Sequence, residues 1–466
     1  MAYNYRFLVR VVLEAETPIV IGSGEKETLT DAPVQKDVNR LPYLPASSIA
    51  GCLRHAVAKC IDKKTNERIF GFQESDKGNG SRLIFTDGRL VGPEGVVDGI
   101  KNDLNTEFFR EFDRLPVRNH VRISEKGSAS QGGKFDEEIV YKGSRFCFEI
   151  EMVSDRANES NDSECLEKVL NQMTRCEFRI GAGSRSGFGK VKVVELKTRK
   201  LDLANAADMA EYLKKSSDLS DPVNFWISVE SKIPAIVVGA DWTAYKLQLV
   251  PQDFFLFASG VASDRVDMCN VTDSRIEWKS EKPEFCKDQI LIPGSSVKGA
   301  ISHRVAFYYN KLTGVTVEKL AEDAKASGKN LEDLIAENTG DKNEAVRTLF
   351  GSQDPKSPCH GNVLISDVIQ EKTGTKVLNH VAVDRFTGGA VNGALFSEEP
   401  WAKKEGQKYE IEFLVNNDAF QNANIQEAFE SALKAVASGM LPLGGGVNRG
   451  HGVFVGTMIK NGEVLK

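Results

Sequence analysis

Two segments of this chain begin a helix with the same polar residues. They read LPASSIAGCLRHAV from Leu44 and ILIPGSSVKGAISHRV from Ile290. In each, two serines follow a proline and precede a glycine: Ser47, Ser48 and Gly51, then Ser295, Ser296 and Gly299. The serines can simply cap the helices. Alternatively, free N–H groups at a helix start bind phosphate. A helical glycine costs ~1 kcal/mol relative to alanine, so its repetition favours the phosphate interpretation.

Carboxylates gather just before each of these helices. The segment IGSGEKETLTDAPVQKD, from Ile21, carries Asp31 and Asp37. The later segment ASGVASDRVDMCNVTDSRIEW, from Ala258, carries Asp264, Asp267 and Asp273. An isolated aspartate is most simply part of an acidic turn. Because Asp273 in TDSRI best matches Asp31 in TDAPV, we predict that these two are equivalent and that the second loop is longer.

The matching segments belong to a longer repeat. IFGF and LFGS are followed by strands that end at Asp87 and Asp367, and RNHVRIS later matches LNHVAVD. IGAGSRSGFGKVKV and LGGGVNRGHGVFVG complete the series. Five paired features in one order indicate that a domain was duplicated.

The elements that must position these residues follow one order in both copies. In the first copy we predict strands within 5–21 and near 82–90, 146–152 and 190–196, with helices at 48–61 and 163–173. This is a ferredoxin-like β-α-β-β-α-β order with insertions, which predicts an α+β fold. The predicted domains are 1–198 and 241–466, joined by 199–240. The charged insertion 315–338 is expected to be a solvated face.

The glycine-rich segments and the hairpins offer further candidate contacts. A dinucleotide loop follows a strand and opens a helix, whereas GAGSRSGFG and GGGVNRGHG each precede a strand, which argues against a Rossmann site. They are either turns or backbone surfaces that present Arg185 or Arg449 to a phosphate. Long hairpins around His120 and His380 suggest contact with a partner, although both histidines can also be core residues.

The composition bounds the class of protein. The chain has 466 residues and a net charge of −6, which argues against non-specific coating by nucleic acid but not against a local basic track. No apolar run approaches the ~18 residues of a membrane span, so no membrane partner is expected. The eight cysteines form no C-x-x-C pair. This makes structural zinc improbable and favours a reducing, cytoplasmic location.

Taken together, these motifs resemble the RAMP (repeat-associated mysterious protein) superfamily. The resemblance is carried by DAPVQKDVNRLPYLPASSIAGCLR, IPGSSVKGAISHR, the two glycine-rich segments and the hairpin segments NHVRIS…GGKFDEEIVYKGSRFCFEI and VDRFTGGAVNGALF. It covers nearly the whole chain in two copies. The similarity is to the backbone subunits of type III CRISPR–Cas effector complexes, the Csm and Cmr members of the Cas-seven group, here as a tandem fusion.

This resemblance implies two RRM-like domains with thumb hairpins, which stack along a CRISPR RNA guide beside other type III subunits. It implies that an aspartate in the first long loop cuts the complementary target RNA, with Mg²⁺ or another divalent cation. By motif match the catalytic residues would be Asp31, Asp273 and Asp37, and Asp31 and Asp273 would hold the metal. A non-catalytic guide-binding subunit and a CRISPR RNA processing nuclease remain alternatives.

The resemblance also implies the residues that contact RNA. In the first copy they are Ser47, Ser48, Gly51, Arg54, His120, Arg122, Gly183 and Arg185. In the second copy they are Ser295, Ser296, Lys298, Gly299, Arg304, His380, Arg385 and Arg449. The copies differ at the helix start, where Ala50 stands opposite Lys298 and Arg54 opposite Ser302.

Overall fold

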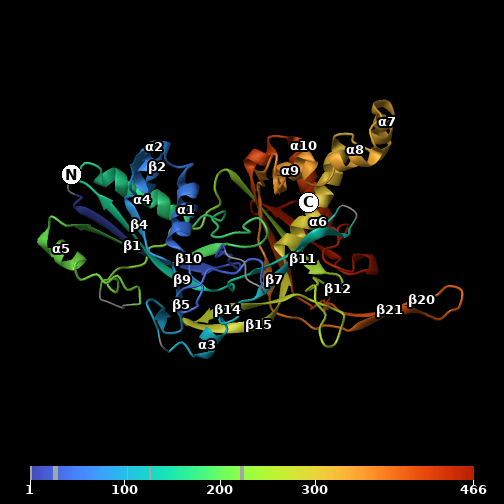
Figure 1. The fold of residues 1–466 in the computed structure, drawn as a ribbon, viewed down its shortest axis with the longest axis horizontal. Coiled ribbons are helices and arrows are strands. Elements are labelled where there is room, and N and C mark those ends of the chain that lie inside the picture. Colours follow the sequence, from blue (N-terminus) through green and yellow to red (C-terminus); the bar gives the residue numbers. More distant parts are fainter. Residues whose placement is uncertain (1–2, 25–29, 102, 125–126, 221–224, 466) are drawn as a thin grey trace.

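The structure is a computed structural model that describes residues 3–24, 30–101, 103–124, 127–220 and 225–465. The chain contains both helices and mostly antiparallel strands, with several strands in succession, which confirms the α+β class. Figure 1 shows two lobes that follow each other in the sequence, the first in blue to green and the second in yellow to red. We call them the first and the second repeat. Each has its own hydrophobic core.

The first repeat is built around strand β1 (Tyr5–Ala15), which lies between β10 (Val191–Asp202) and β9 (Arg145–Ser154). The far edge of β9 pairs with β4 (Leu83–Phe85) and β5 (Arg89–Gly92). Alternate β1 side chains enter the core because successive residues of a strand face opposite sides of a sheet. Helices α1 (Ala46–Val57) and α4 (Glu159–Gln172) pack together in this half.

The second repeat has the same strand order. Strand β11 (Trp242–Pro251) lies between β24 (Phe454–Lys460) and β23 (Tyr409–Asn416), and β18 (Val363–Ile365) pairs with β23. Helices α6 (Gly294–Leu312) and α10 (Ala423–Ala437) pack against each other. In each repeat, the first of these four strands in chain order (β1 or β11) therefore lies between the fourth and the third.

Each repeat also carries a hairpin beside its sheet. The first thumb consists of β7 (Val117–Ile123) and β8 (Ala129–Glu138), and the second thumb of β20 (Leu378–Val383) and β21 (Ala390–Glu399). Figure 1 shows β20 and β21 extending away from the body, whereas β7 lies between the two lobes. Short strand β13 (Met268–Cys269) pairs in parallel with β21.

The remaining helices and strands lie outside these two sheets and hairpins or at their edges. The helices are α2 (Lys63–Phe70), α3 (Glu107–Arg110), α5 (Ala206–Tyr212), α7 (Val317–Ser327), α8 (Leu331–Glu337) and α9 (Glu344–Phe350), with 3₁₀ turns at Gly340–Lys342, Asn417–Phe420 and Val447–Arg449. The strands are β2 (Phe72–Glu74), β3 (Lys77–Asn79), β6 (Gly95–Val96), β12 (Phe254–Phe255), β14 (Thr272–Lys279), β15 (Lys282–Ile292), β16 (Gly351–Ser352), β17 (Cys359–His360), β19 (Val368–Gln370), β22 (Trp401–Ala402) and β25 (Glu463–Leu465).

The predicted connection 199–240 is not a free linker in its described part. Strand β10 continues to Asp202, inside it. Farther along, Phe225 and Trp226 are buried against Leu8 and Leu201 of the first repeat. The Trp226 indole donates a hydrogen bond of 2.7 Å to Glu149. Most of this connection therefore packs against the first repeat; residues 221–224 lie outside the described residues.

The second repeat clasps the first with an inserted hairpin. We call β14 and β15 the clasp hairpin; it follows the acidic loop of the second repeat, which carries Asp264 and Asp267, and precedes helix α6. Its Ile276 is buried in the core of the first repeat, and the Trp278 indole donates to the Gly143 carbonyl at 2.7 Å. Phe285 completes an aromatic cluster of the first repeat, whose other rings are Phe108, Phe112 and Tyr141.

The first repeat reaches back across the junction with its glycine-rich loop. The Gly187 carbonyl accepts a hydrogen bond from the Asp367 N–H at 3.1 Å. A Cβ on Gly187 would lie 1.9 Å from a carboxylate oxygen of Asp367, and a Cβ on Gly294 would lie 2.9 Å from the Gly187 Cα. Both glycines are thus required by the close approach of the two repeats.

Candidate active site and nucleic-acid interface

Asp31 is an exposed carboxylate held at the base of the first thumb. Its N–H donates to Asp136 Oδ1 at 2.8 Å, and the Asp136 N–H donates to Asp31 Oδ2 at 3.3 Å. The neighbouring Ala32 pairs in parallel with Glu137. This reciprocal clamp fixes the loop and places two carboxylates side by side at the surface.

In the second repeat the same position belongs to Asp267. Its N–H donates to Ser397 Oγ at 3.2 Å, and the Ser397 N–H donates to Asp267 Oδ2 at 2.8 Å. The next residue, Met268, pairs in parallel with Glu398, as Ala32 pairs with Glu137. Hydrogen bonds from the backbone and side chain of Ser397 lower the pKa of Asp267. The prediction that Asp273 is equivalent to Asp31 is therefore wrong.

The two acidic loops have equal length up to their aspartates. Bridges join Gly22 to Val34 in the first repeat and Ala258 to Asn270 in the second. Asp31 follows Gly24 by seven residues, as Asp267 follows Gly260, and both glycines have φ +79°. The extra residues of the second copy form the clasp hairpin, after the aspartate. The Ser-Gly pair that precedes both loops was the sequence signal that could have identified Asp267.

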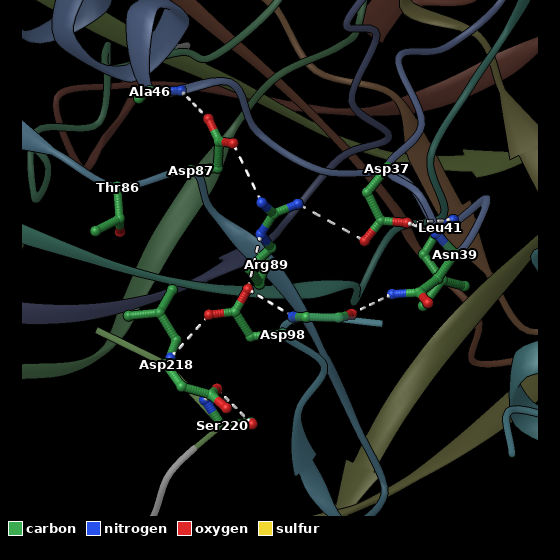
Figure 2. A network of polar contacts seen from close by, with 12 residues as sticks. Asp37, Asn39, Leu41, Ala46, Thr86, Asp87, Arg89, Asp98, Asp218 and Ser220 are labelled. Atoms are coloured by element: carbon green, nitrogen blue, oxygen red, sulfur yellow. Dashed lines mark hydrogen bonds and ion pairs between the residues drawn. The ribbon is translucent and has the colours of Figure 1, made fainter. Parts of the chain in front are cut away.

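Asp37 has a structural role in its loop (Figure 2). Its Oδ1 accepts the N–H groups of Asn39 at 2.8 Å and Leu41 at 3.0 Å, and its Oδ2 lies 3.7 Å from Arg89. The side chain is only 5% exposed. Because the side chain is nearly buried and both of its oxygens are engaged, we do not retain Asp37 as a catalytic group.

Asp273 is the counterpart of Asp37 and is also withdrawn from solvent. Thr272 pairs with Ile290 in the second repeat, as Lys36 pairs with Pro42 in the first. Asp273 Oδ2 lies 2.6 Å from the Arg118 guanidinium, and its side chain is 2% exposed. Burial raises the pKa of Asp273, although Arg118 opposes the shift. Asp273 is therefore engaged in a buried ion pair between the repeats and, unlike Asp31, is not exposed.

Each thumb carries a histidine stacked on a phenylalanine. The ring centroids of His120 and Phe135 are 4.8 Å apart, as are those of His380 and Phe396. His120 Nε2 lies 2.9 Å from Glu137, and His380 Nε2 lies 2.8 Å from Glu398. The two histidines are half-buried and occupy equivalent positions at the base of the thumbs.

Glu398 is the centre of a buried cluster that the sequence did not reveal. Besides His380, it accepts hydrogen bonds from Arg449 Nη2 and His451 Nε2, both at 2.7 Å. Burial would raise the pKa of Glu398, but these donors outweigh burial and lower it to about 2. Arg449 therefore points inward to a carboxylate, and only part of its guanidinium is available to a ligand.

The predicted serine caps are absent from α1 and α6, whereas the predicted phosphate contact at these helix starts stays a prediction. No side chain caps α1 or α6 within its own first turn. Instead Asp87 Oδ1 accepts the Ala46 N–H at 2.9 Å, and Asp367 Oδ1 accepts the Gly294 N–H at 2.7 Å. A protein carboxylate therefore already occupies the first anion position of each helix. The serines lie beside it and are exposed or half-buried: Ser47, Ser48, Ser295 and Ser296.

Gly51 and Gly299 face open space. Apart from the neighbouring residues and backbone of its own helix, no protein atom lies within 4 Å of the position that a Cβ would take at either residue. Gly51 also lines an open cavity of about 370 Å³ between α1 and α2, together with Arg54, His55 and Lys63. Packing within the chain therefore does not explain these glycines. The cavity beside the first is polar, and its lining also includes Glu67, which lies 3.5 Å from Lys63.

The junction of the repeats brings two predicted RNA contacts together. Arg185, on the first glycine-rich loop, donates to the Gly361 carbonyl at 2.5 Å. Lys298, on α6, has its pKa lowered by burial and by the nearby charge of Arg185. Of the other predicted contacts, Arg54, Arg122, Gly183 and Arg385 are exposed, whereas Arg304 donates to the Met440 carbonyl at 3.3 Å.

Three further observations concern metal binding, membrane spans and the cysteines. Among the described residues, no group of three or more His, Cys, Asp or Glu is arranged to hold a metal ion. In the same residues no helix combines the length and apolarity that a membrane crossing requires. All eight cysteines lie in the described ranges and are free thiols.

The sequence profile of the RAMP superfamily matches residues 12–192 and, a second time, residues 255–455. The chain belongs to the RAMP superfamily. The two matches coincide with the two structural repeats, so this RAMP chain contains the family unit twice. The tandem duplication predicted from the five motif pairs is confirmed.

Similar proteins include three named CRISPR system Cms endoribonuclease Csm3. The one from Streptococcus thermophilus is 26% identical over 200 residues, which cover 40% of this chain and 86% of the relative. Those from Methanothermobacter thermautotrophicus and Enterococcus italicus are 28% and 27% identical, covering 43% and 40% of this chain and 88% and 89% of the relatives. Each relative thus corresponds in length to one repeat.

Proposed function

We propose that this RAMP chain is a backbone subunit of a type III CRISPR ribonucleoprotein, with two target-RNA cleavage loops at Asp31 and Asp267. The observation that carries the proposal is the same clamp in both repeats, with an exposed aspartate held against the base of a thumb. The relatives named as endoribonucleases correspond to one such repeat. The chain then works in the cytoplasm beside other type III subunits.

In this proposal each repeat is a ferredoxin-like RAMP domain. The strand orders β10-β1-β9-β4 and β24-β11-β23-β18, each with two helices packed together, support this assignment. The guide RNA passes over the helix starts and the first glycine-rich loop. Arg185 and Lys298 lie near each other there, across the junction. The negative charge of the RNA phosphates compensates the positive charge of these two cations.

The proposed reaction needs little covalent work from the protein. The ribose 2′-OH gives its proton to solvent water and attacks the adjacent phosphate, and the bond from phosphorus to the 5′ oxygen of the next nucleotide breaks. A 2′,3′-cyclic phosphate remains, and the departing 5′ oxygen takes a proton from solvent to become a hydroxyl group. The protein must hold this phosphate in line and stabilise the developing charge. An effective general base has a pKa near the working pH. Asp267 has a lowered pKa, so its role is to stay ionised rather than to take up a proton.

The donors present fit a divalent cation that is shared with the substrate. Mg²⁺ is typically held by one or two carboxylates together with phosphate oxygens and water. Asp31 and Asp136 supply two carboxylates in the first repeat, whereas Asp267 stands beside Ser397 and supplies one. Bound there, the cation offsets charge on the phosphoryl oxygens. Each loop otherwise contributes its fixed backbone and the base of its thumb.

The test is cleavage of complementary RNA by the guide-loaded complex with Mg²⁺. We expect Asp31→Ala to remove one set of product bands and Asp267→Ala to remove another. Folded Asp37→Ala and Asp273→Ala retain both sets. If all bands survive Asp31→Ala and Asp267→Ala together, the chain is a structural guide-binding subunit. Cutting of precursor RNA that persists in EDTA would instead indicate a processing nuclease.

A further inference from the structure

The junction between the two repeats provides a template for how the chain docks other molecules. At the junction, one face of the first repeat contacts one face of the second repeat, which we call the receiving face. The second repeat has a face equivalent to that of the first repeat, and the first repeat has a face equivalent to the receiving face. Neither of these two equivalent faces lies at the junction, and we call them the outer faces. If these two open faces matched the junction, copies of the chain would stack end to end. Four differences argue against this.

The first difference is a methyl group at the receiving helix. Gly294 and Ala46 are equivalent, because each begins its helix and donates its N–H to an aspartate. At the junction a Cβ on Gly294 would lie 2.9 Å from the Gly187 Cα, closer than packed carbon atoms approach. Ala46 has that Cβ, so it prevents a glycine-rich loop from docking as closely.

The second difference is the ion pair. Arg118 pairs across its thumb with Glu137, as Leu378 pairs with Glu398, so Leu378 takes the place of Arg118. Arg118 contacts Asp367 at 2.9 Å across the junction. The counterpart of Asp367 is Asp87, which already lies 3.3 Å from Arg89 of its own repeat (Figure 2). Neither charge of the junction is available at the open faces.

The third and fourth differences concern the clasp. The first repeat has no counterpart of the clasp hairpin, because its chain turns directly from Asp37 to Leu41. The receiving aromatic cluster is also absent from the second repeat. In the first repeat Val140 pairs with Ile19, and at the equivalent position of the second repeat Trp401 pairs with Phe255. The residues that follow, Tyr141 and Ala402, are therefore counterparts. Self-stacking would therefore lack both halves of the aromatic contact.

The outer face of the second repeat is nevertheless open for a partner. Gly450 is the counterpart of Gly187. The N–H groups of the two residues that flank Gly450 donate to the Gly446 carbonyl, and those of the two residues that flank Gly187 donate to the Gly183 carbonyl. Gly187 is buried at the junction, whereas Gly450 is exposed with nothing within 4 Å of a Cβ position. Val447 beside it is 45% exposed.

We propose that the outer face of the second repeat docks a RAMP-type domain of a different chain, and that this chain occurs once per complex. The partner's helix begins with glycine at the position of Gly294, and it meets Leu378 with an apolar residue rather than a carboxylate. The inference rests on the proposed function only in taking the partner to be another RAMP-type subunit. The two thumbs then face different neighbours.

The test measures copy number and contact in the ribonucleoprotein complex purified through this chain. Unlabelled and ¹⁵N-labelled chains are co-expressed, and the complex is analysed by native mass spectrometry and by lysine cross-linking. We expect one 51.3 kDa copy per complex and no cross-link between a light and a heavy chain. Two or more copies joined by mixed cross-links would overturn the proposal.

A pair of matched variants tests the face itself. Val447→Glu places a charge beside Gly450, whereas Val464→Glu places one on β25; both valines are exposed, at 45% and 61%. We expect Val447→Glu to release the neighbouring RAMP-type subunit and Val464→Glu to retain it. Retention of every subunit by Val447→Glu would overturn the proposal. A single-copy complex without RNA cleavage would contradict only the proposed nuclease function.

Discussion

Arg118 of the first repeat and Asp273 of the second form a buried ion pair, with 2.6 Å between Nη2 and Oδ2. A second carboxylate, Asp367, lies 2.9 Å from the same guanidinium. Burial works to lower the pKa of Arg118, but the two carboxylates outweigh it and raise the pKa. Arg118 therefore stays charged and joins two segments of the second repeat to the first thumb.

Removal of one carboxylate from this group should weaken the junction. We expect Asp273→Ala to lower the free energy of unfolding by about 3 kcal/mol, because breaking a buried ion pair leaves charge poorly compensated. Asp267→Ala, at an exposed carboxylate, should change it by less than about 0.5 kcal/mol. Urea unfolding followed by tryptophan fluorescence measures both, since Trp278 lies at the junction. Equal effects of the two variants would contradict this assignment.

Two equivalent glycines allow packing at the junction to be separated from backbone strain. Gly187 and Gly450 have φ +121° and +90°, so alanine is strained at either. We expect Gly450→Ala to cost about 1 kcal/mol. Gly187→Ala should cost several times more, because its Cβ would collide with Asp367. Thermal unfolding of the two variants gives the comparison, and similar losses of stability would argue that the junction is not tightly packed.

The Glu398 cluster predicts sensitivity to acid. Its pKa is about 2 in the folded chain and about 4.5 when unfolded. Because the folded pKa is depressed, Glu398 contributes stability above about pH 4.5, and this contribution is lost as the pH falls toward 2. The difference amounts to about 3 kcal/mol. Glu398→Gln should remove most of this pH dependence in urea unfolding between pH 5 and pH 3.

A matched variant serves as the control for that measurement. Glu137 is the counterpart of Glu398. Glu398 contacts two histidines and one arginine, whereas of the corresponding groups only His120 lies near Glu137. Glu137→Gln should leave the acid dependence nearly unchanged. If both variants behave alike, the second donor set around Glu398 does not stabilise its ionised form.

The cations at the junction predict a measurable salt dependence of guide binding. We expect Lys298→Ala to weaken binding of guide RNA and to reduce the slope of log affinity against log salt by about 1, because one phosphate contact is lost. Lys319→Ala, in the exposed helix α7, should leave the slope unchanged. Filter binding at several salt concentrations measures both slopes. An unchanged slope for Lys298→Ala would place the RNA elsewhere.

The local sequence pattern was enough to predict the duplication and the approximate positions of the principal helices. Five motif pairs in one order established the duplication, because a repeated fold requires its turns and helix starts at matching places. Hydrophobic periodicity and the glycine-rich turns placed the principal helices within a few residues. The predicted helix 163–173, for example, overlaps α4, which spans Glu159–Gln172. Asp31 is exposed in its loop, and its catalytic role stays a prediction.

The tertiary structure decided which carboxylates are accessible. The sequence alone does not distinguish the roles of the four loop aspartates, Asp31, Asp37, Asp267 and Asp273. The Thr-Asp match favoured the wrong pair. Only the partners distinguish them: Asp31 and Asp267 bond to the bases of the thumbs, whereas Asp37 and Asp273 meet arginines from elsewhere in the sequence. Burial and ion pairing depend on residues distant in the chain, and local sequence does not encode them.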